Sequence, residues 1–256
     1  LGGRPSKVDS TAAEALPGVE RVMEIPPFQA APAFQPVGGV AVIADSTWAA
    51  WEGRKALAVE WDSGANAVYD SEAYGEELLA EVRKPGRVVR EEGDTEAALA
   101  EAVQVVEADY ELPMLAHAPM ESPCATARFV DGRCEVWAPT QAPQSARSTV
   151  AQVLGMSPDD VTIHVTLLGG GFGRKSKPDY CAEAALLARV LGVPVQVVWT
   201  REDDIRHDYY PAVAAIGIQA GIDAAGRTSA WLARSAFPPI TSTFRSGARQ
   251  GGDGEL

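Results

Sequence analysis

A glycine-rich segment is the part of the sequence whose residue types most directly suggest chemistry. Four of the five residues from Gly169 to Gly173 are glycine, and the segment joins an apolar run to a helical pattern. Glycine tolerates positive φ angles and lets a ligand approach the backbone closely, so the N–H groups of such a loop can face an anion. Arg174 and Lys175 follow and add positive charge. The segment therefore predicts a loop that holds a phosphate or a cofactor.

Two common phosphate-binding motifs do not fit this loop. A Walker A loop ends in Gly-Lys-Ser or Gly-Lys-Thr, and Arg174 occupies the position of that glycine. The dinucleotide motif needs a third glycine, and Arg174 or Ser176 stands there instead. The simplest alternative is a tight turn that only reverses the chain. Phe172, a large ring inside the glycine run, indicates packing against either the core or a ligand.

Two other loops carry polar side chains that could meet the glycine-rich segment. His117 and Glu121 are four residues apart, but Pro119 between them interrupts the helical face that a shared metal site would need. We therefore expect a structural role for this pair and no metal ligand from the protein. Gln141 ends a predicted strand, and its amide can both donate and accept hydrogen bonds. Taken alone, Gln141 would also suit a surface position or a helix start.

The periodicity of apolar residues predicts the elements that must position these loops. Strands are predicted over 39–44, 57–61, 105–112, 161–167 and 195–199. Helices are predicted over 71–82, 94–103, 144–154 and 179–191, with shorter ones after Ser46 and Thr200. Two hairpins complete the pattern, one over 124–138 and one over 212–237. The segment from Pro26 to Pro36 is predicted to be irregular.

The first hairpin also decides how two cysteines are placed. A two-residue turn at Asp131-Gly132 puts Phe129 opposite Cys134. Cys124 is an odd number of residues from Phe129, so the two thiols lie on opposite faces of the sheet and cannot form a disulfide. With Cys181 in a predicted helix, all three thiols are expected to be free, as in a reducing compartment.

Composition excludes several classes of protein. The chain of 256 residues has 22 basic and 35 acidic residues, a formal net charge of −13, which disfavours a nucleic-acid partner. No apolar run approaches the about 20 residues of a membrane-spanning helix. The chain opens on Leu1 without a methionine, ends on a glycine-rich stretch to Leu256, and carries no signal for a terminal helix or strand. We therefore expect a fragment of a longer protein.

Three spaced motifs resemble a known family. They are His117-Ala-Pro-Met-Glu121, Trp137-Ala-Pro-Thr-Gln141 and Gly169-Gly-Gly-Phe-Gly-Arg-Lys175. In this order they are similar to the molybdenum-binding subunit of the xanthine dehydrogenase and aldehyde oxidase family, in its isoquinoline 1-oxidoreductase-like branch. The resemblance implies an α+β fold in three parts. These are a partial α/β hammerhead-like domain (1–66), an acidic helical connector (67–104) and the N-terminal part of a mixed-sheet domain that binds the molybdenum cofactor (105–256).

The resemblance also implies a cofactor, a reaction and a partner. The cofactor is a molybdenum-pyranopterin, in bacteria usually the cytosine dinucleotide form, and we expect it to be absent from the fragment alone. The reaction is oxidative hydroxylation of an N-heteroaromatic compound or an aldehyde, with electrons passed to a [2Fe-2S] small subunit. Gln141 and Phe172 would be the catalytic residues. The cofactor would be held by Gln141 together with Gly169, Gly170, Gly171, Phe172, Gly173 and Arg174.

Two departures from the family pattern limit this interpretation. Purine-oxidising relatives have Gly-Lys-Glu after the glycine run, whereas this chain has Arg174-Lys175-Ser176, which argues against xanthine as substrate. The family's catalytic base is a glutamate in a C-terminal half that this chain does not match, so the chain alone is expected to be inactive. The alternatives are a non-catalytic ligand-binding or assembly module on the same fold and a nucleotide-binding protein that uses Lys175.

Overall fold

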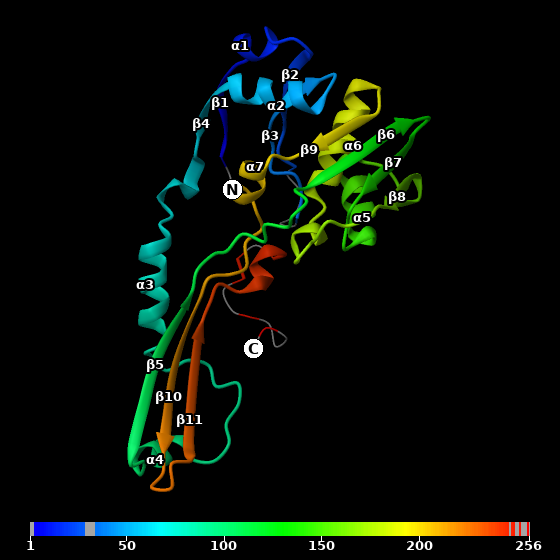
Figure 1. Ribbon diagram of the computed structural model, residues 1–256. Coiled ribbons are helices and arrows are strands. Elements are labelled where there is room, and N and C mark those ends of the chain that lie inside the picture. The colour runs from blue at the N-terminus through cyan, green and yellow to red at the C-terminus, as the bar shows by residue number, and fades with distance from the viewer. Residues whose placement is uncertain (1–2, 29–33, 246, 249–250, 252–254, 256) are drawn as a thin grey trace. The chain divides into compact units, whose positions relative to one another are not determined.

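The computed structural model describes residues 3–28, 34–245, 247–248, 251 and 255, and its chain divides into two compact units. The first unit comprises Leu1–Val68 and Ala116–Tyr209, and the second comprises Tyr69–Leu115 and Tyr210–Leu256. Both units contain helices and strands, which confirms the predicted α+β class (Figure 1). Among the described helices, none is both long and apolar enough to cross a membrane.

A four-stranded sheet in the order β8-β7-β6-β9 forms the centre of the first unit. Its strands are β6 (Cys124–Val130), β7 (Arg133–Ala138), β8 (Val161–Val165) and β9 (Val195–Val198). The hairpin β6–β7 pairs Phe129 with Cys134 as predicted, and the three cysteines are free. β8 runs parallel to β7. It ends at Val165, two residues before the predicted end and four residues before the first glycine of the glycine-rich loop.

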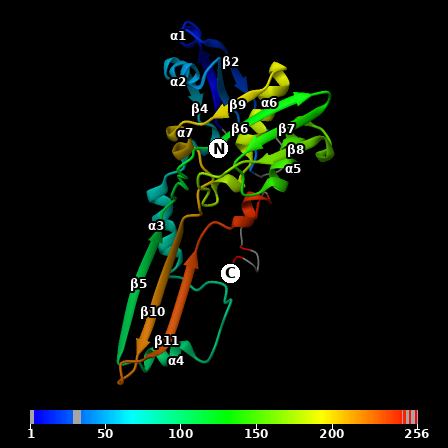
Figure 2. The same cartoon turned by 45° about the vertical axis from the view of Figure 1, so that its right-hand side comes forward.

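Two helices pack on this sheet and supply its core. They are α5 (Pro143–Leu154) and α6 (Asp179–Leu191), which lie beside the sheet in Figures 1 and 2. Their apolar faces bury small and branched side chains against the strands, among them Val150 of α5 and Cys181 of α6, in one core with Val136 of β7. Gly155 and Gly192 end the two helices in the left-handed conformation, which glycine adopts without a steric penalty. The predicted end of each helix is therefore confirmed.

The start of the first unit contains two strands that the sequence did not predict, β1 (Arg4–Asp9) and β2 (Val19–Ile25), each paired with a strand that it did predict. β1 pairs with β4 (Ala58–Asp62), and β2 pairs with β3 (Gly39–Ala44), with α1 (Thr11–Glu14) and α2 (Thr47–Ala56) between them. The sequence shows no strand signal at this end, yet β1 is a strand. It is polar and contains a proline, and pairing with β4 holds it in the extended conformation. Ser46 caps α2 as predicted. Of the segment predicted to be irregular, residues 29–33 lie outside the described residues.

Short elements complete the first unit. The 3-10 turns are η1 (Gly64–Val68), η2 (Pro158–Asp160) and η3 (Arg174–Ser176). The helix α7 (Arg201–Arg206) begins after Thr200, whose hydroxyl accepts the N–H of Asp203 at 3.1 Å and donates to the Asp203 carboxylate at 2.8 Å. The helix predicted to begin after Thr200 is therefore confirmed.

The second unit is a three-stranded antiparallel sheet in the order β11-β10-β5. It consists of β5 (Gln104–Leu112), β10 (Ala214–Ile222) and β11 (Thr228–Ala236), with α3 (Ser71–Glu81), α4 (Thr95–Ala100) and η4 (Ile240–Thr243). α3 packs on this sheet and buries Leu78 against Val213 and Ala215. α4 ends before the predicted Val103, because the N–H of Val103 donates to the carbonyl of Ile222 and extends the sheet.

Candidate functional site

The glycine-rich loop follows β8 and has an unusual backbone. Gly170, Phe172 and Gly173 have positive φ angles of 90°, 52° and 106°. Glycine accepts this region freely, but Phe172 carries a side chain, and such a residue in a left-handed conformation is held there by its surroundings at a cost of about 1 kcal/mol or more. Strained residues of this kind concentrate at binding and catalytic sites. The strained backbone therefore marks this loop as a candidate functional site.

Glu121 fixes the beginning of the loop. The N–H of Gly169 donates to Glu121 Oε2 at 3.0 Å, and the N–H of Glu121 donates back to the carbonyl of Gly169 at 3.0 Å. The buried ammonium group of Lys175 forms an ion pair with the same carboxylate. Burial alone would raise the pKa of Glu121, but the hydrogen bonds from Lys175 and Gly169 bring the pKa below its usual value.

Gln141 fixes the end of the loop. Its Oε1 accepts the N–H of Gly173 at 3.0 Å, and its own backbone N–H donates to the carbonyl of Lys175 at 3.0 Å. A Cβ atom placed on Gly171 would lie only 2.4 Å from Oε1 of Gln141, so a side chain at this position would displace the carboxamide of Gln141. The structure therefore brings together the amide and the loop that the sequence singled out separately.

Between these two fixed ends, several hydrogen-bond donors remain available. Within the described part of the chain, the backbone N–H groups of Gly170, Gly171 and Phe172 donate to no protein acceptor. The same holds for Nε2 of Gln141, whose side chain is exposed. A cluster of backbone N–H groups in alternating conformations, joined by a side-chain amide, suits the oxygen atoms of an anionic group. The donor set therefore fits an oxygen-rich, negatively charged ligand.

The two basic residues that follow the loop point into the protein. The guanidinium group of Arg174 is fully buried and donates to both carboxylate oxygens of Asp179 at 2.9 Å. It lies 5.0 Å from the ring centre of Trp199 and 5.7 Å from that of Tyr209. Lys175 is equally buried, against Glu121. These side chains support the loop from within, and the phosphate contact expected of Lys175 in a nucleotide-binding protein is not what this geometry favours.

His117 lies against the same loop. Its Nδ1 is 2.9 Å from Oδ2 of Asp208, and its backbone N–H donates to that oxygen at 2.7 Å. A Cβ atom on Gly173 would lie 3.1 Å from Nε2 of His117. The loop that holds His117 and Glu121 thus converges on the glycine run, as the sequence suggested. Asp208 and Asp179 were not predicted to take part. The partner of Asp208, His117, lies 91 residues away, and although Arg174 is only five residues from Asp179, the sequence does not show that both side chains turn into the core.

Three apolar side chains within or next to the loop are exposed to solvent. Phe172 is 73% exposed, Met120 is 87% exposed and Leu167 is 96% exposed. The ring of Phe172 is therefore not part of the protein core, which leaves a ligand or another protein surface as its possible contact. Among the described residues, no group of three or more His, Cys, Asp or Glu side chains could hold a metal ion.

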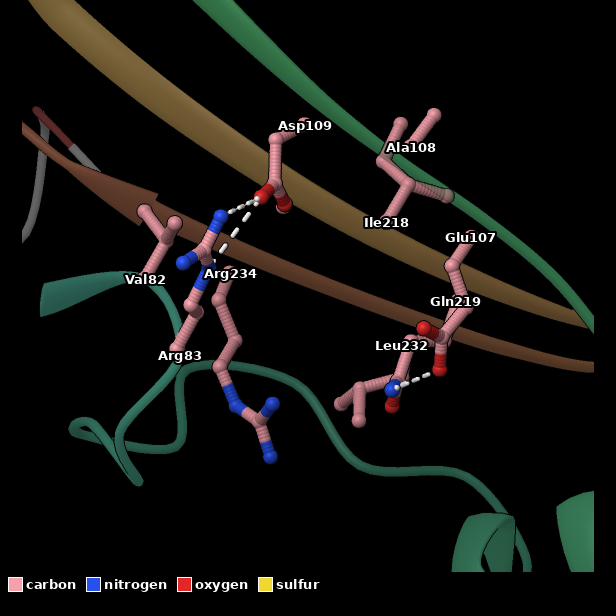
Figure 3. A pocket seen from close by; sticks show the side chains of 10 residues that line it. Val82, Arg83, Glu107, Ala108, Asp109, Ile218, Gln219, Leu232 and Arg234 are labelled. Carbon is pink, nitrogen blue, oxygen red and sulfur yellow. Dashed lines mark hydrogen bonds and ion pairs between the residues drawn. The ribbon is translucent and has the colours of Figure 1, made fainter. Parts of the chain in front are cut away.

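A separate groove of about 360 Å³ lies on the sheet of the second unit (Figure 3). Its walls carry an ion pair between Arg83 and Asp109 at 2.8 Å and a hydrogen bond from Gln219 to Glu107 at 2.6 Å. The side chains in this groove largely satisfy one another, whereas the glycine-rich loop leaves donors free. We therefore assign the candidate site to the loop and not to the groove.

Known proteins resemble the chain over most of its length. The β subunit of isoquinoline 1-oxidoreductase from Brevundimonas diminuta is 29% identical over 86% of this chain and 28% of that protein. A second relative, from the nicotinate dehydrogenase of Pseudomonas putida, is 29% identical over 93% of this chain and 19% of that protein. The chain thus spans less than a third of the length of these relatives.

Solved structures share the fold. Quinoline 2-oxidoreductase from Pseudomonas putida 86 superposes with a TM-score of 0.65 at 24% identity, over 91% of this chain and 34% of that one. Aldehyde oxidoreductase from Desulfovibrio gigas superposes with a TM-score of 0.63 at 21% identity, over 88% of this chain and 28% of that one. The family model of the molybdopterin cofactor-binding domain matches residues 80–236, more than half of the chain. This chain therefore belongs to the molybdopterin cofactor-binding domain family.

Proposed function

We propose that the chain forms part of a molybdenum hydroxylase that oxidises an N-heteroaromatic compound or an aldehyde. The observation that carries the proposal is the contact between Gln141 and Gly173 beside a run of unpaired amide donors. The relatives named for isoquinoline, nicotinate and quinoline support the first of these substrate classes. A purine substrate is disfavoured, since Ser176 stands where a purine-orienting carboxylate would be.

The residues of the loop would hold the cofactor through its oxygen atoms. Nε2 of Gln141 would donate to an oxygen ligand of the metal, and the amides of Gly170, Gly171 and Phe172 would donate to the oxygens nearest the loop. Arg174 would contribute through its backbone, because its side chain is buried on Asp179. When bound, the molybdenum-pyranopterin group supplies the two-electron redox chemistry that no side chain can provide.

These donors would act by pre-organisation. The carboxamide of Gln141 is held at Oε1 by Gly173, so its NH2 group is oriented before any ligand binds. Donors that need no reorientation stabilise charge as it develops, which is the largest contribution in many enzymes. Phe172 would exclude water from one side of the site and limit which flat substrates can approach.

The remaining parts of the enzyme would come from outside this chain. We propose the cytosine dinucleotide form of the cofactor, a [2Fe-2S] small subunit as electron acceptor, and a catalytic base in the polypeptide that the relatives have beyond the matched region. A non-catalytic module on the same fold is the rival hypothesis. It predicts that the longer protein holds no molybdenum, and this distinguishes the two.

Substitution of Gln141 in the longer protein tests the proposal. Gln141→Glu keeps an oxygen for the N–H of Gly173 but replaces the free NH2 group with a negatively charged oxygen. We expect kcat for an N-heteroaromatic substrate to fall by about 100-fold, the usual effect of losing one such donor. Gln144→Ala is the matched control, since Gln144 is an exposed residue of the adjacent helix α5. Full activity of Gln141→Glu, or a wild-type protein without molybdenum, would refute the proposal.

A further inference from the structure

The pair formed by His117 and Asp208 is more constrained than a structural histidine requires. Both carboxylate oxygens of Asp208 lie within hydrogen-bond distance of Nδ1, at 2.9 and 3.0 Å, and Oδ2 also accepts the backbone N–H of His117 at 2.7 Å. The Asp208 side chain is fully buried, and that of His117 is 11% exposed. An acceptor on this side places the proton on Nδ1, so Nε2 is left on the opposite edge of the ring.

That opposite edge meets Gly173. A Cβ atom on Gly173 would lie 3.1 Å from Nε2 and 3.3 Å from Cδ2 of His117. The imidazole ring therefore occupies the space beside Gly173 that a side chain would otherwise fill. The ring thus packs against one side of Gly173, whose φ angle of 106° only glycine adopts readily.

Gly173 is also the residue that orients Gln141. Its N–H is the donor that Oε1 of Gln141 accepts at 3.0 Å. Asp208, His117, Gly173 and the carboxamide of Gln141 thus lie next to one another in this order, with hydrogen bonds at both ends of the series and close approach of the ring to Gly173 in the middle. A movement of Gly173 would release Oε1 and let the carboxamide rotate about its last bond, which would exchange its oxygen and its NH2 group.

We propose that His117, oriented by Asp208, is a positioning residue that fixes Gly173 and thereby turns the NH2 group of Gln141 toward the ligand. The inference rests on the proposed function, in which that NH2 group contacts the cofactor. The contacts themselves exist without the cofactor, so they can be tested in this chain alone.

Exchange of the Gly173 amide proton with water, measured by NMR on the 15N-labelled chain, reports directly on this contact. We expect His117→Ala to speed this exchange about tenfold, because the bond to Gln141 is no longer held in place. Imidazole added to the solution should enter the space left beside Asp208 and slow the exchange again. A general loss of stability would instead speed the exchange of amide protons throughout the chain and not at Gly173 alone.

His164→Ala is the matched control. His164 also pairs with a carboxylate, with Nε2 3.2 Å from Oε1 of Glu135, and its ring stacks on Trp137 at 4.7 Å. We expect this variant to leave the exchange of Gly173 unchanged. If His117→Ala does not fold, His117→Gln replaces it, with faster exchange at Gly173 and no response to imidazole expected.

An unchanged exchange rate at Gly173 in a folded His117 variant would overturn the inference. In the longer holoenzyme, His117→Ala should lower kcat while KM stays constant. A wild-type protein that contains no molybdenum but shows the expected exchange behaviour would refute the proposed function and leave the positioning contact intact. The two failures are therefore distinguishable.

Discussion

At the scale of single residues, two polar side chains hold the glycine-rich loop in its shape through hydrogen bonds to its backbone. Glu121 holds its first residue and Gln141 holds its last, while Lys175 neutralises Glu121 from within. The ammonium group of Lys175 is fully buried, whereas the carboxylate of Glu121 is partly exposed to water. Loss of the ion pair would therefore cost more in the solvation of Lys175 than in that of Glu121. Removal of the carboxylate charge would leave a buried cation without its counter-ion.

Glu121→Gln should therefore destabilise the chain by about 1–3 kcal/mol, less than for a fully buried pair because Glu121 itself is partly exposed. The pKa of Glu121 is lowered in the folded state, so its stabilisation is present above the unfolded pKa of about 4.3 and is lost as pH falls through the lower folded pKa. Urea unfolding between pH 7 and pH 3 measures both effects. Glu52→Gln, in the exposed pair with Lys55, is the control and should change stability by less than about 0.5 kcal/mol. Equal effects of the two variants would contradict this account.

The parts of the site that sequence could reveal are those with a local signal. The glycine run has a composition that is unusual wherever it lies, and Gln141 was singled out as the last residue of the motif Trp137-Ala-Pro-Thr-Gln141. Asp208 and Asp179 are ordinary acidic residues in a chain with 35 of them. The role of Asp208 arises only when folding brings His117, 91 residues away, beside it, and such a partner leaves no trace in local spacing. Asp179 lies only five residues after Arg174, but its role depends on the burial of both side chains, which the spacing does not reveal.

At the scale of elements, the first turn of α6 anchors the loop to the core. Asp179 begins this helix and binds the guanidinium group of Arg174 with both oxygens. Burial alone would lower the pKa of Arg174, but the charge of Asp179 raises it, so the guanidinium group stays charged. The planar fork and the stacking on Trp199 are properties that lysine does not share.

Arg174→Lys should accordingly cost about 2–4 kcal/mol of stability, since one buried oxygen of Asp179 loses its donor. The matched control is Arg128→Lys. Arg128 also pairs with a carboxylate, Glu135, and lies over the ring of Trp137 at 5.9 Å, but it is half exposed. We expect the control to cost less than about 1 kcal/mol. Thermal unfolding measures both variants, and a similar loss in the two would show that burial of Arg174 contributes nothing.

Element boundaries were predictable where the signal was local. α6 and β3 match their predicted limits, since Gly192 ends the helix and an apolar run that stops at Asp45 defines the strand. α4 and β8 end early because tertiary pairing decides their last residues. β1 was missed for the converse reason, because a polar segment becomes a strand only beside its partner.

At the scale of the whole molecule, the described residues form one wall of the candidate site and not an enclosed cavity. The exposed side chains of Met120, Leu167 and Phe172 flank the loop, and no described residue covers them. On such an open wall, water competes with the ligand for every amide donor, and each hydrogen bond contributes little net affinity. The relatives are more than three times as long as this chain, and the additional polypeptide would supply the opposite wall.

We therefore expect this chain, produced in a host that makes the molybdenum cofactor, to retain far less than one molybdenum per chain after gel filtration and to show no hydroxylase activity. The longer protein should retain close to one molybdenum. Metal analysis of both proteins, purified side by side, makes the comparison, and the longer protein is the control for cofactor supply in the host. Stoichiometric molybdenum in the short chain would mean that the loop and Gln141 bind the cofactor without an opposite wall. In that case the free donors of Gly170, Gly171 and Phe172 would have to provide nearly all of the affinity.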